Sequence, residues 1–341
     1  MAMQVGMVGA GRMGANLARR LTRAGHGCVV YDSVPEAVEP LRADGARTAS
    51  SLAELVAGLA TPRVVWLMVP VERTGSVLDE VAGLLDPGDV VIDGGNSYYR
   101  DSVARARELG VAGIRFVDVG TSGGVYGLQR GFCLMIGGET VTVRWLDPVF
   151  RALAPGGMDG AAGAQSNGQV DGVDTAELGY LHCGPAGAGH FVKMVHNGIE
   201  YGQMAALAEG LEILQRAGIG DGATGGGAGV RPDDAEVDGS ELDVARIAEV
   251  WRRGSVISSW LLDLTAGVLR DDPQLEGFSG HVADSGEGRW TVQTAVEEGV
   301  PAYVLTAALY ERFSSRRSRG YADRVLSGMR HAFGGHQERQ H

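Results

Sequence analysis

The chain has 341 residues, with 30 Lys or Arg against 42 Asp or Glu, so its formal net charge is −12. Apolar residues make up 44% and charged residues 21%, which is typical of a globular protein of about two domains and excludes a disordered chain. An acidic chain repels nucleic acid and anionic lipid unless its basic residues cluster, so we expect neither as a partner. An anionic substrate then requires a local basic pocket.

The cysteines, histidines and apolar runs exclude further classes of protein. Cys28, Cys133 and Cys183 have no C-x-x-C spacing, which is typical of reduced thiols and indicates a cytoplasmic setting. No apolar run approaches the roughly 20 residues of a membrane-spanning helix. The eight histidines show no metal-binding spacing, so no metal site is predicted.

Short apolar runs alternate with helical patterns over the first 150 residues, which predicts βαβ units around a parallel sheet. The expected strands are 3–8, 28–31, 64–69, 90–93, 116–119 and 133–136. A helix is expected at 13–24, between the first two of them. We therefore predict an N-terminal Rossmann-type, doubly wound α/β domain over residues 1–155.

The pattern changes after a Gly/Ala/Ser-rich segment, 156–177, which we interpret as a linker or insertion. Apolar residues recur at helical spacing over 190–216, and a second glycine-rich patch, 218–239, is expected to form a loop. Further helices are expected at 242–253, 255–269, 293–298, 304–313 and 321–333. Residues 178–341 are therefore predicted to form an all-α substrate and oligomerisation domain with a C-terminal tail.

A G-x-G-x-x-G motif follows the first predicted strand and opens the first predicted helix. Gly9 permits the tight turn, Gly11 lets the backbone approach a pyrophosphate, and Gly14 allows close packing of helix on strand. The pyrophosphate would lie at the positive end of the helix. Further cofactor contacts are expected from Arg12 and Met13 in the motif and from Val69 at the end of the third strand.

Asp32 ends the second predicted strand, near the position of an acid that binds the adenosine ribose of NAD. A carboxylate there accepts hydrogen bonds from the 2′-hydroxyl and repels a 2′-phosphate, and no arginine follows within four residues. The sequence thus favours NAD as cofactor and disfavours NADP. The alternative is a glycine turn with an ordinary surface aspartate.

Four polar residues share one face of the long, otherwise apolar helix. Lys193, His196, Asn197 and Glu200 fall at i, i+3, i+4 and i+7. Buried Lys and Glu are rare without partners or purpose, so this face is a candidate catalytic site. The alternative is a structural ion-pair network, which also perturbs pKa values.

Segments 93–97 (DGGNS), 122–124 (SGG) and 184–203 (GPAGAGHFVKMVHNGIEYGQ) resemble the decarboxylating 6-phosphogluconate dehydrogenases. The resemblance extends from Gln4 almost to His336 and fits the shorter form of that family. It implies oxidative decarboxylation of 6-phospho-D-gluconate to D-ribulose 5-phosphate and CO2, in the pentose phosphate pathway, with hydride transfer to NAD.

The resemblance also implies roles for individual residues. Lys193 matches the general base, which must shed its proton near neutral pH, and Glu200 matches the acid that protonates C1 of the enediol. The remaining matched positions bind the substrate or lie between it and the nicotinamide: Asn96, Ser122, Gly123, Gly124, His196 and Asn197.

Basic residues near the C-terminus match the family's phosphate site. Tyr201, Arg289 and Arg312 match that pocket, with Arg289 where many relatives have lysine. Arg330 and His336 match a C-terminal tail that reaches into a neighbouring subunit's active site. The resemblance therefore implies a homo-oligomer with shared sites.

Two other functions stay open from the sequence. One is a related β-hydroxyacid dehydrogenase that acts on a small unphosphorylated hydroxy acid; the basic residues and Glu200 argue against it. The other is a nucleotide-sensing binding protein that has lost turnover, which the presence of both Lys193 and Glu200 opposes.

Overall fold

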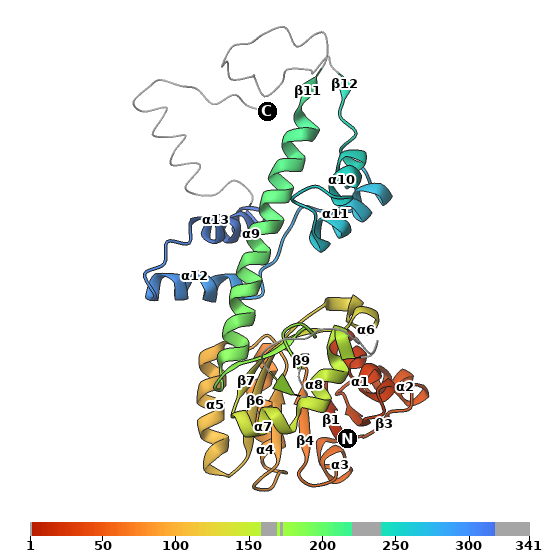
Figure 1. The fold of residues 1–341 in the computed structure, drawn as a ribbon, viewed down its shortest axis with the longest axis vertical. Helices are drawn as coiled ribbons and strands as arrows, with labels where there is room; N and C mark the ends of the chain where they lie inside the picture. Colours follow the sequence, from red (N-terminus) through yellow and green to blue (C-terminus); the bar gives the residue numbers. More distant parts are fainter. Residues whose placement is uncertain (1, 158–168, 171–172, 220–239, 318–341) are drawn as a thin grey trace. The chain divides into compact units, whose positions relative to one another are not determined.

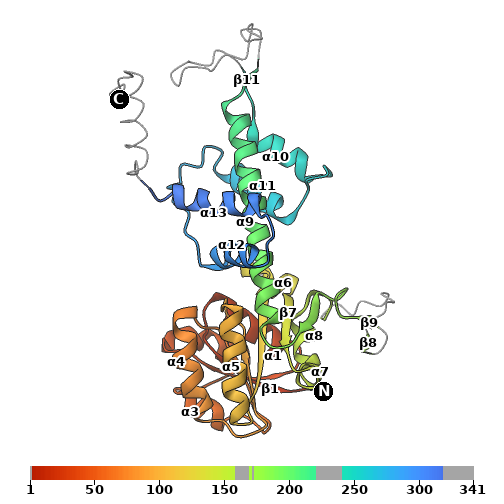
Figure 2. The ribbon, with the colours of Figure 1, turned by 90° about the vertical axis from the view of Figure 1, so that its left-hand side faces the viewer.

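The computed structural model describes residues 2–157, 169–170, 173–219 and 240–317. The chain divides into two compact units, the first ending at Asn197 and the second beginning at Gly198. Figures 1 and 2 show the ribbon from two directions. Among the described residues, no helix combines the length and apolar character that a membrane span requires.

The first unit is built on an eight-stranded sheet with the order β10-β7-β6-β5-β4-β1-β2-β3. The strands are β1 (Gln4–Val8), β2 (Gly27–Tyr31), β3 (Arg47–Thr48), β4 (Val64–Leu67), β5 (Val90–Asp93), β6 (Arg115–Ser122), β7 (Cys133–Gly138) and β10 (Tyr180–Gly184). Read from β3 to β6, this is the doubly wound order 3-2-1-4-5-6, so the predicted Rossmann-type fold is confirmed. The order reverses between β1 and β4, where such folds bind a dinucleotide.

The sheet is buried because helices cover both of its faces. One face packs on α1 (Arg12–Arg23), α2 (Pro35–Ala43), α7 (Thr140–Trp145) and α8 (Asp147–Leu153), and the other on α3 (Leu52–Ala57), α4 (Val71–Ala82) and α5 (Tyr99–Val111). In β4 all four residues are buried, and alternate side chains enter opposite cores: Trp66 joins the first and Leu67 the second. This explains the continuous apolar runs in the sequence.

The second unit consists mainly of helices. The helix α9 (Ala188–Arg216) begins in the first unit and continues into the second. Two pairs of helices pack on it at different heights (Figures 1 and 2): α12 (Glu287–Glu297) with α13 (Tyr303–Ser314), and α10 (Val244–Arg252) with α11 (Trp260–Asp271). Small apolar clusters hold each pair, one around Tyr201 and Leu309 and one around Ala248 and Ala266.

The structure differs from the expectations in several places. Strand β7 runs antiparallel to β6, because only the short helices η1 (Gly124–Tyr126) and α6 (Gly127–Arg130) join them. Strand β10 pairs with β7 within the first unit, although the second domain is predicted to start at residue 178. The sequence also missed β3, and α12 begins six residues before the predicted start of that helix.

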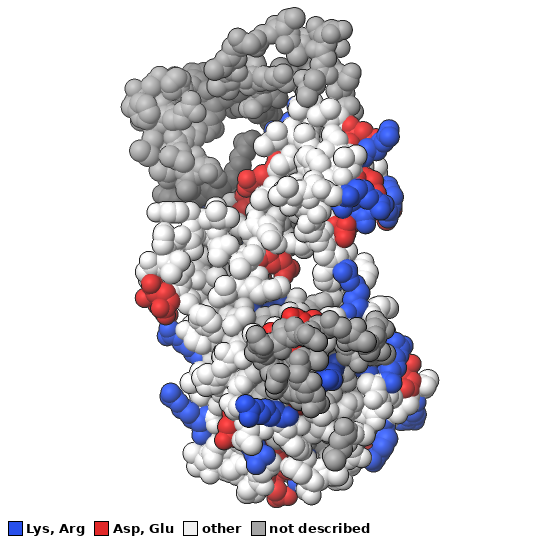
Figure 3. All heavy atoms as spheres, in the orientation of Figure 1, with Lys and Arg blue, Asp and Glu red and all other residues white. Residues whose placement is uncertain are grey.

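The glycine-rich patches fall mostly outside the described residues. Their described ends form η2 (Pro155–Gly157) and two short antiparallel pairs, β8 (Gln169–Val170) with β9 (Val173–Asp174) and β11 (Gly218–Ile219) with β12 (Ser240–Glu241). The helix predicted at 321–333 also lies outside the described ranges. On the face shown in Figure 3, basic and acidic side chains of the described residues are interspersed.

Candidate active site

The Gly9 loop joins β1 to α1 at the carboxyl edge of the sheet. Gly9 has a φ of +98°, and its N–H donates to the carbonyl oxygen of Tyr31 at 2.8 Å. A Cβ on Gly14 would collide with the carbonyl oxygen of Gly9, whereas one on Gly11 would find nothing within 4 Å. The absence of a Cβ on Gly14 lets the helix and the strand pack closely, and the open space at Gly11 leaves room for a ligand against the backbone.

Asp32, just after β2, is held against the Gly9 loop. Its Oδ2 accepts a hydrogen bond from the Ala10 N–H at 2.6 Å, and its Oδ1 accepts one from the Val34 N–H at 2.9 Å. The carboxylate is therefore fixed in position and partly exposed beside the loop. An acid held there suits the hydroxyls of a ribose and opposes a phosphate on the same sugar.

The remaining predicted cofactor residues lie at the same edge. Arg12 and Met13 form the first turn of α1, which no side chain in the described part of the chain caps. The backbone N–H groups of that turn suit a pyrophosphate. Val69 follows β4 and Asn96 follows β5, so these residues and the open space at Gly11 fit a dinucleotide.

A buried carboxylate fixes the loop that carries Asn96. Asp93 accepts hydrogen bonds from the Gly95 N–H at 3.1 Å, the Ser97 hydroxyl at 2.7 Å and Arg105 Nη1 at 3.1 Å. Asn96 itself is exposed, so it is available to a bound molecule.

Asp118 anchors the start of α9. This side chain on β6 is 0% exposed, and it accepts the N–H of Gly187 at 2.6 Å through Oδ1 and that of His190 at 2.8 Å through Oδ2. A carboxylate is favourable at this position because the first N–H groups of a helix lack partners within the helix and carry partial positive charge. Asp118 is not among the residues predicted from the sequence, although an acid inside the apolar run 116–119 is a signal for such a role.

Three glycines bring the start of α9 against β6 and β7. A Cβ on Gly189 would lie 2.6 Å from the Asp118 carbonyl oxygen, and one on Gly137 would lie 2.7 Å from the Gly189 nitrogen. A Cβ on Gly120 would collide with the Cβ of Lys193. Lys193 is thus seated on β6 with 7% of its surface exposed.

Other predicted residues gather near Lys193 in the first unit. His196 Nε2 lies 3.5 Å from the Ser122 hydroxyl, and its Nδ1 lies 3.2 Å from the Asn197 side-chain oxygen. Ser122 ends β6, and Gly123 and Gly124 follow it with φ values of +141° and +54°. The structure therefore brings the Ser122 loop and the polar face of α9 together.

The predicted phosphate residues meet in the second unit. The Arg312 guanidinium carbon lies 3.4 Å from the centre of the Tyr201 ring, and its Nη1 donates to the Ala283 carbonyl at 2.9 Å. Arg289 pairs with Asp284 beside that carbonyl, with Nε to Oδ1 at 2.7 Å. The hydrogen bond from Arg289 lowers the pKa of the Asp284 carboxyl to about 2.

Three predicted site residues remain to be located in the structure. Arg330 and His336 lie outside the described residues. Glu200 lies on α9 seven residues after Lys193, so the regular helix keeps the two on one face. Within the described ranges, no group of three or more His, Cys, Asp or Glu could hold a metal ion.

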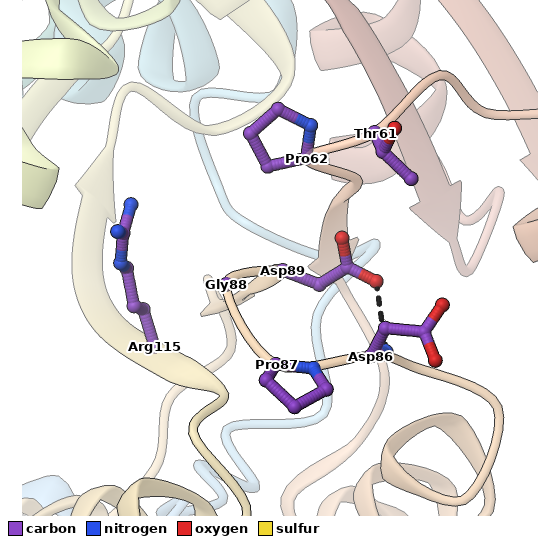
Figure 4. A pocket seen from close by; sticks show the side chains of 7 residues that line it. All are labelled: Thr61, Pro62, Asp86, Pro87, Gly88, Asp89 and Arg115. Atoms are coloured by element: carbon purple, nitrogen blue, oxygen red, sulfur yellow. Dashed lines mark hydrogen bonds between the residues drawn. The ribbon is translucent and has the colours of Figure 1, made fainter.

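A pocket of about 330 Å³ lies elsewhere in the first unit (Figure 4). Thr61, Pro62, Asp86, Asp89 and Arg115 are among its lining residues. They precede or begin β4, β5 and β6, so the pocket is at the amino edge of the sheet, opposite the Gly9 loop. Ligands of doubly wound folds bind at the carboxyl edge, so this pocket is separate from the candidate site.

Comparison with known proteins identifies the family of both parts of the chain. The family model of the NAD binding domain of 6-phosphogluconate dehydrogenase matches residues 4–162, and the model of the C-terminal domain of that enzyme matches residues 189–221 and 235–340. The chain is 37% identical to an NAD(+)-dependent, decarboxylating 6-phosphogluconate dehydrogenase of Haloferax volcanii. It is 36% identical to a protein of Bacillus subtilis described as a putative 6-phosphogluconate dehydrogenase. Both matches cover 98% of each chain.

The fold also resembles that of a longer enzyme. A solved 6-phosphogluconate dehydrogenase of Plasmodium falciparum superposes with a TM-score of 0.72 at 22% identity, over 98% of this chain and 65% of the other. The chain therefore has the length of the archaeal and Bacillus relatives and spans 65% of the Plasmodium chain.

Proposed function

Because the chain belongs to the 6-phosphogluconate dehydrogenase family, we propose that it oxidises and decarboxylates 6-phospho-D-gluconate to D-ribulose 5-phosphate and CO2. The observation that carries the proposal is the position of Lys193. This side chain is buried against Gly120, and His196, three residues later, contacts Ser122. A decarboxylating dehydrogenase requires a base fixed in this way beside the groups that hold its substrate.

Lys193 acts first as a base. It takes the proton from the C3 hydroxyl while the hydride leaves C3, which produces a β-keto acid. When bound, the nicotinamide cofactor accepts that hydride. Only the neutral amine can act as a base, so this role requires Lys193 to release its own proton near neutral pH.

The same lysine, now protonated, assists the loss of CO2. The bond between C1 and C2 breaks, and its electron pair becomes the enediol, whose developing oxyanion Lys193 stabilises. Glu200 then donates a proton to the former C2, which becomes C1 of ribulose 5-phosphate. His196, Asn197 and Ser122 hold the substrate in line with these groups.

Asp32 supports NAD as the preferred cofactor. Its two hydrogen bonds to backbone N–H groups fix the carboxylate where a ribose 2′-hydroxyl would donate to it. A 2′-phosphate at this point would be repelled by the negative charge. The NAD(+)-dependent relative from Haloferax volcanii agrees with this preference.

The phosphate group of the substrate is bound by Tyr201, Arg289 and Arg312, which lie together in the second unit. Arg330 and His336 are proposed to complete the site from a neighbouring copy of the chain, so the working enzyme is a homo-oligomer. A small unphosphorylated hydroxy acid has no phosphate for these cations to bind. The match of the C-terminal family model also favours the phosphorylated substrate.

One steady-state assay tests the proposal. 6-Phosphogluconate and gluconate are each offered with NAD and with NADP, and ribulose 5-phosphate and CO2 are measured beside the reduced cofactor. We expect turnover of 6-phosphogluconate with NAD, and release of CO2 in equal amount to reduced cofactor. A stable keto acid without CO2 would contradict decarboxylation, and turnover of gluconate alone would favour the related dehydrogenase.

Two variants assign the roles. Lys193→Ala should abolish turnover while NAD affinity, measured by calorimetry, stays at the wild-type value. Glu200→Gln should retain hydride transfer and slow the protonation of the enediol. Turnover by Lys193→Ala would remove this lysine as the base.

A further inference from the structure

A cluster of three arginines in the second unit extends beyond the residues that the sequence predicted. Arg289 and Arg312 are the predicted pair, and Arg316, just after α13, is the third. Arg316 donates from Nη2 to Oδ2 of Asp284 at 2.7 Å, and from Nε to the Arg312 carbonyl at 3.0 Å. The cluster is therefore joined through hydrogen bonds as well as proximity.

Asp284 bridges two of these cations. Arg289 Nη2 lies 3.1 Å from Oδ2 of Asp284, the same oxygen that Arg316 contacts. The two guanidinium groups also lie over one aromatic ring, that of Phe313, with their central carbons 4.5 and 5.3 Å from its centre. The guanidinium groups of Arg289 and Arg316 are thus close enough for two oxygens of one phosphate to contact one group each.

The charges of the cluster are unbalanced. Arg289 and Arg316 both pair with the single carboxylate of Asp284, whose side chain is only 4% exposed, whereas their own side chains are 51% and 27% exposed. Arg312 adds a third positive charge beside them through its bond to the Ala283 carbonyl. If the ion pair served only to hold the end of α13 in place, one arginine would be enough to balance the charge of Asp284. The excess of positive charge faces solvent and suits a phosphate monoester, which carries about −1.5 to −2 at neutral pH.

We propose that Arg316 is a further phosphate-binding residue of the substrate site, and that Asp284 is the positioning residue that holds it beside Arg289. This inference rests on the proposed function, because it takes Arg289 as a phosphate ligand. A guanidinium offers five N–H donors, so Arg289 and Arg316 each keep donors for the phosphate while Asp284 holds them. The phosphate is then bound by both guanidinium groups beside Phe313.

The test compares two neighbouring arginines. Arg316→Gln removes a cation of the cluster, and Arg317→Gln removes one from the next position, which is exposed. The affinity for 6-phosphogluconate is measured by calorimetry on the full chain, and kcat and KM by steady-state assay. We expect Arg316→Gln to weaken binding and raise KM by about tenfold or more with kcat little changed, because a charged hydrogen bond is lost. Arg317→Gln should stay within about twofold of the wild type, the change expected of a screened surface charge.

Further outcomes separate the two proposals. Equal losses in both variants would indicate a general effect of charge and would overturn the role of Arg316, as would wild-type affinity in Arg316→Gln. If the wild type binds 6-phosphogluconate without turnover, the proposed function fails, and the affinity ratio still decides the role of Arg316. Should Arg316→Gln not fold, Arg316→Met decides: it keeps the apolar stem beside Phe313 but removes the charge and the N–H donors, and wild-type affinity in it overturns the proposal.

Discussion

A single methyl group on β6 should displace the proposed catalytic base. In Gly120→Ala, the added Cβ would collide with the Cβ of Lys193 and lie 3.0 Å from both its Cγ and the Gly189 carbonyl oxygen. Ordinary contacts of this kind are 3.4–4 Å, so α9 and β6 must separate by roughly 0.4–1 Å. A displacement of 1 Å at a reacting group can cost about 10²-fold in rate, and overpacking costs about 1–3 kcal/mol of stability.

The assay is the steady-state turnover of 6-phosphogluconate, together with urea unfolding and calorimetric titration of NAD. We expect kcat to fall by about 10- to 100-fold in Gly120→Ala while NAD affinity is unchanged, because the Gly9 loop lies on other strands. Gly110→Ala is the matched control: Gly110 lies in α5, and a Cβ there meets nothing within 4 Å. Wild-type turnover in folded Gly120→Ala would refute the close seating of Lys193 as a requirement of catalysis.

Three further predictions concern carboxylates. Asp32→Ser should reduce the ratio of kcat/KM with NAD to kcat/KM with NADP by about tenfold or more, because a charge that opposes the 2′-phosphate is lost. An unchanged ratio would exclude Asp32 from this role. Asp118→Asn should lower the free energy of unfolding by about 1–3 kcal/mol in urea titrations. The amide has only one oxygen, so it cannot accept from the N–H groups of both Gly187 and His190 as the carboxylate does. Unchanged stability and turnover would show that Asp118 does not anchor α9. The pKa of Asp284 is lowered from 3.8 to about 2, chiefly by its hydrogen bond from Arg289, so its contribution is present above pH 4 and lost as the pH falls towards 2. Urea titrations between pH 5 and 2 should show a loss of at most about 2 kcal/mol in the wild type that is missing in Asp284→Asn, and parallel curves for the two proteins would contradict the pairing.

The sequence by itself determined the features that depend on neighbours along the chain. The alternation of apolar runs predicted six strands of the sheet, because both faces of those strands are buried and need continuous apolar residues. The Gly9–Gly14 motif predicted the tight turn and the open approach at Gly11, since these follow from the absence of a Cβ. Helical spacing likewise placed Lys193 and Glu200 on one face of α9.

Only the tertiary structure decided which distant residues support that face. Asp118 meets the backbone of α9 about 70 positions later, and Gly120 makes room for Lys193, because β6, β7 and α9 pack in one place. Asp284 likewise joins Arg289 to Arg316, 32 positions away, through the packing of α12 and α13. Periodicity reports which side of an element is buried but not what lies against it, so contacts that depend on strand order and helix packing have no local signal in the sequence.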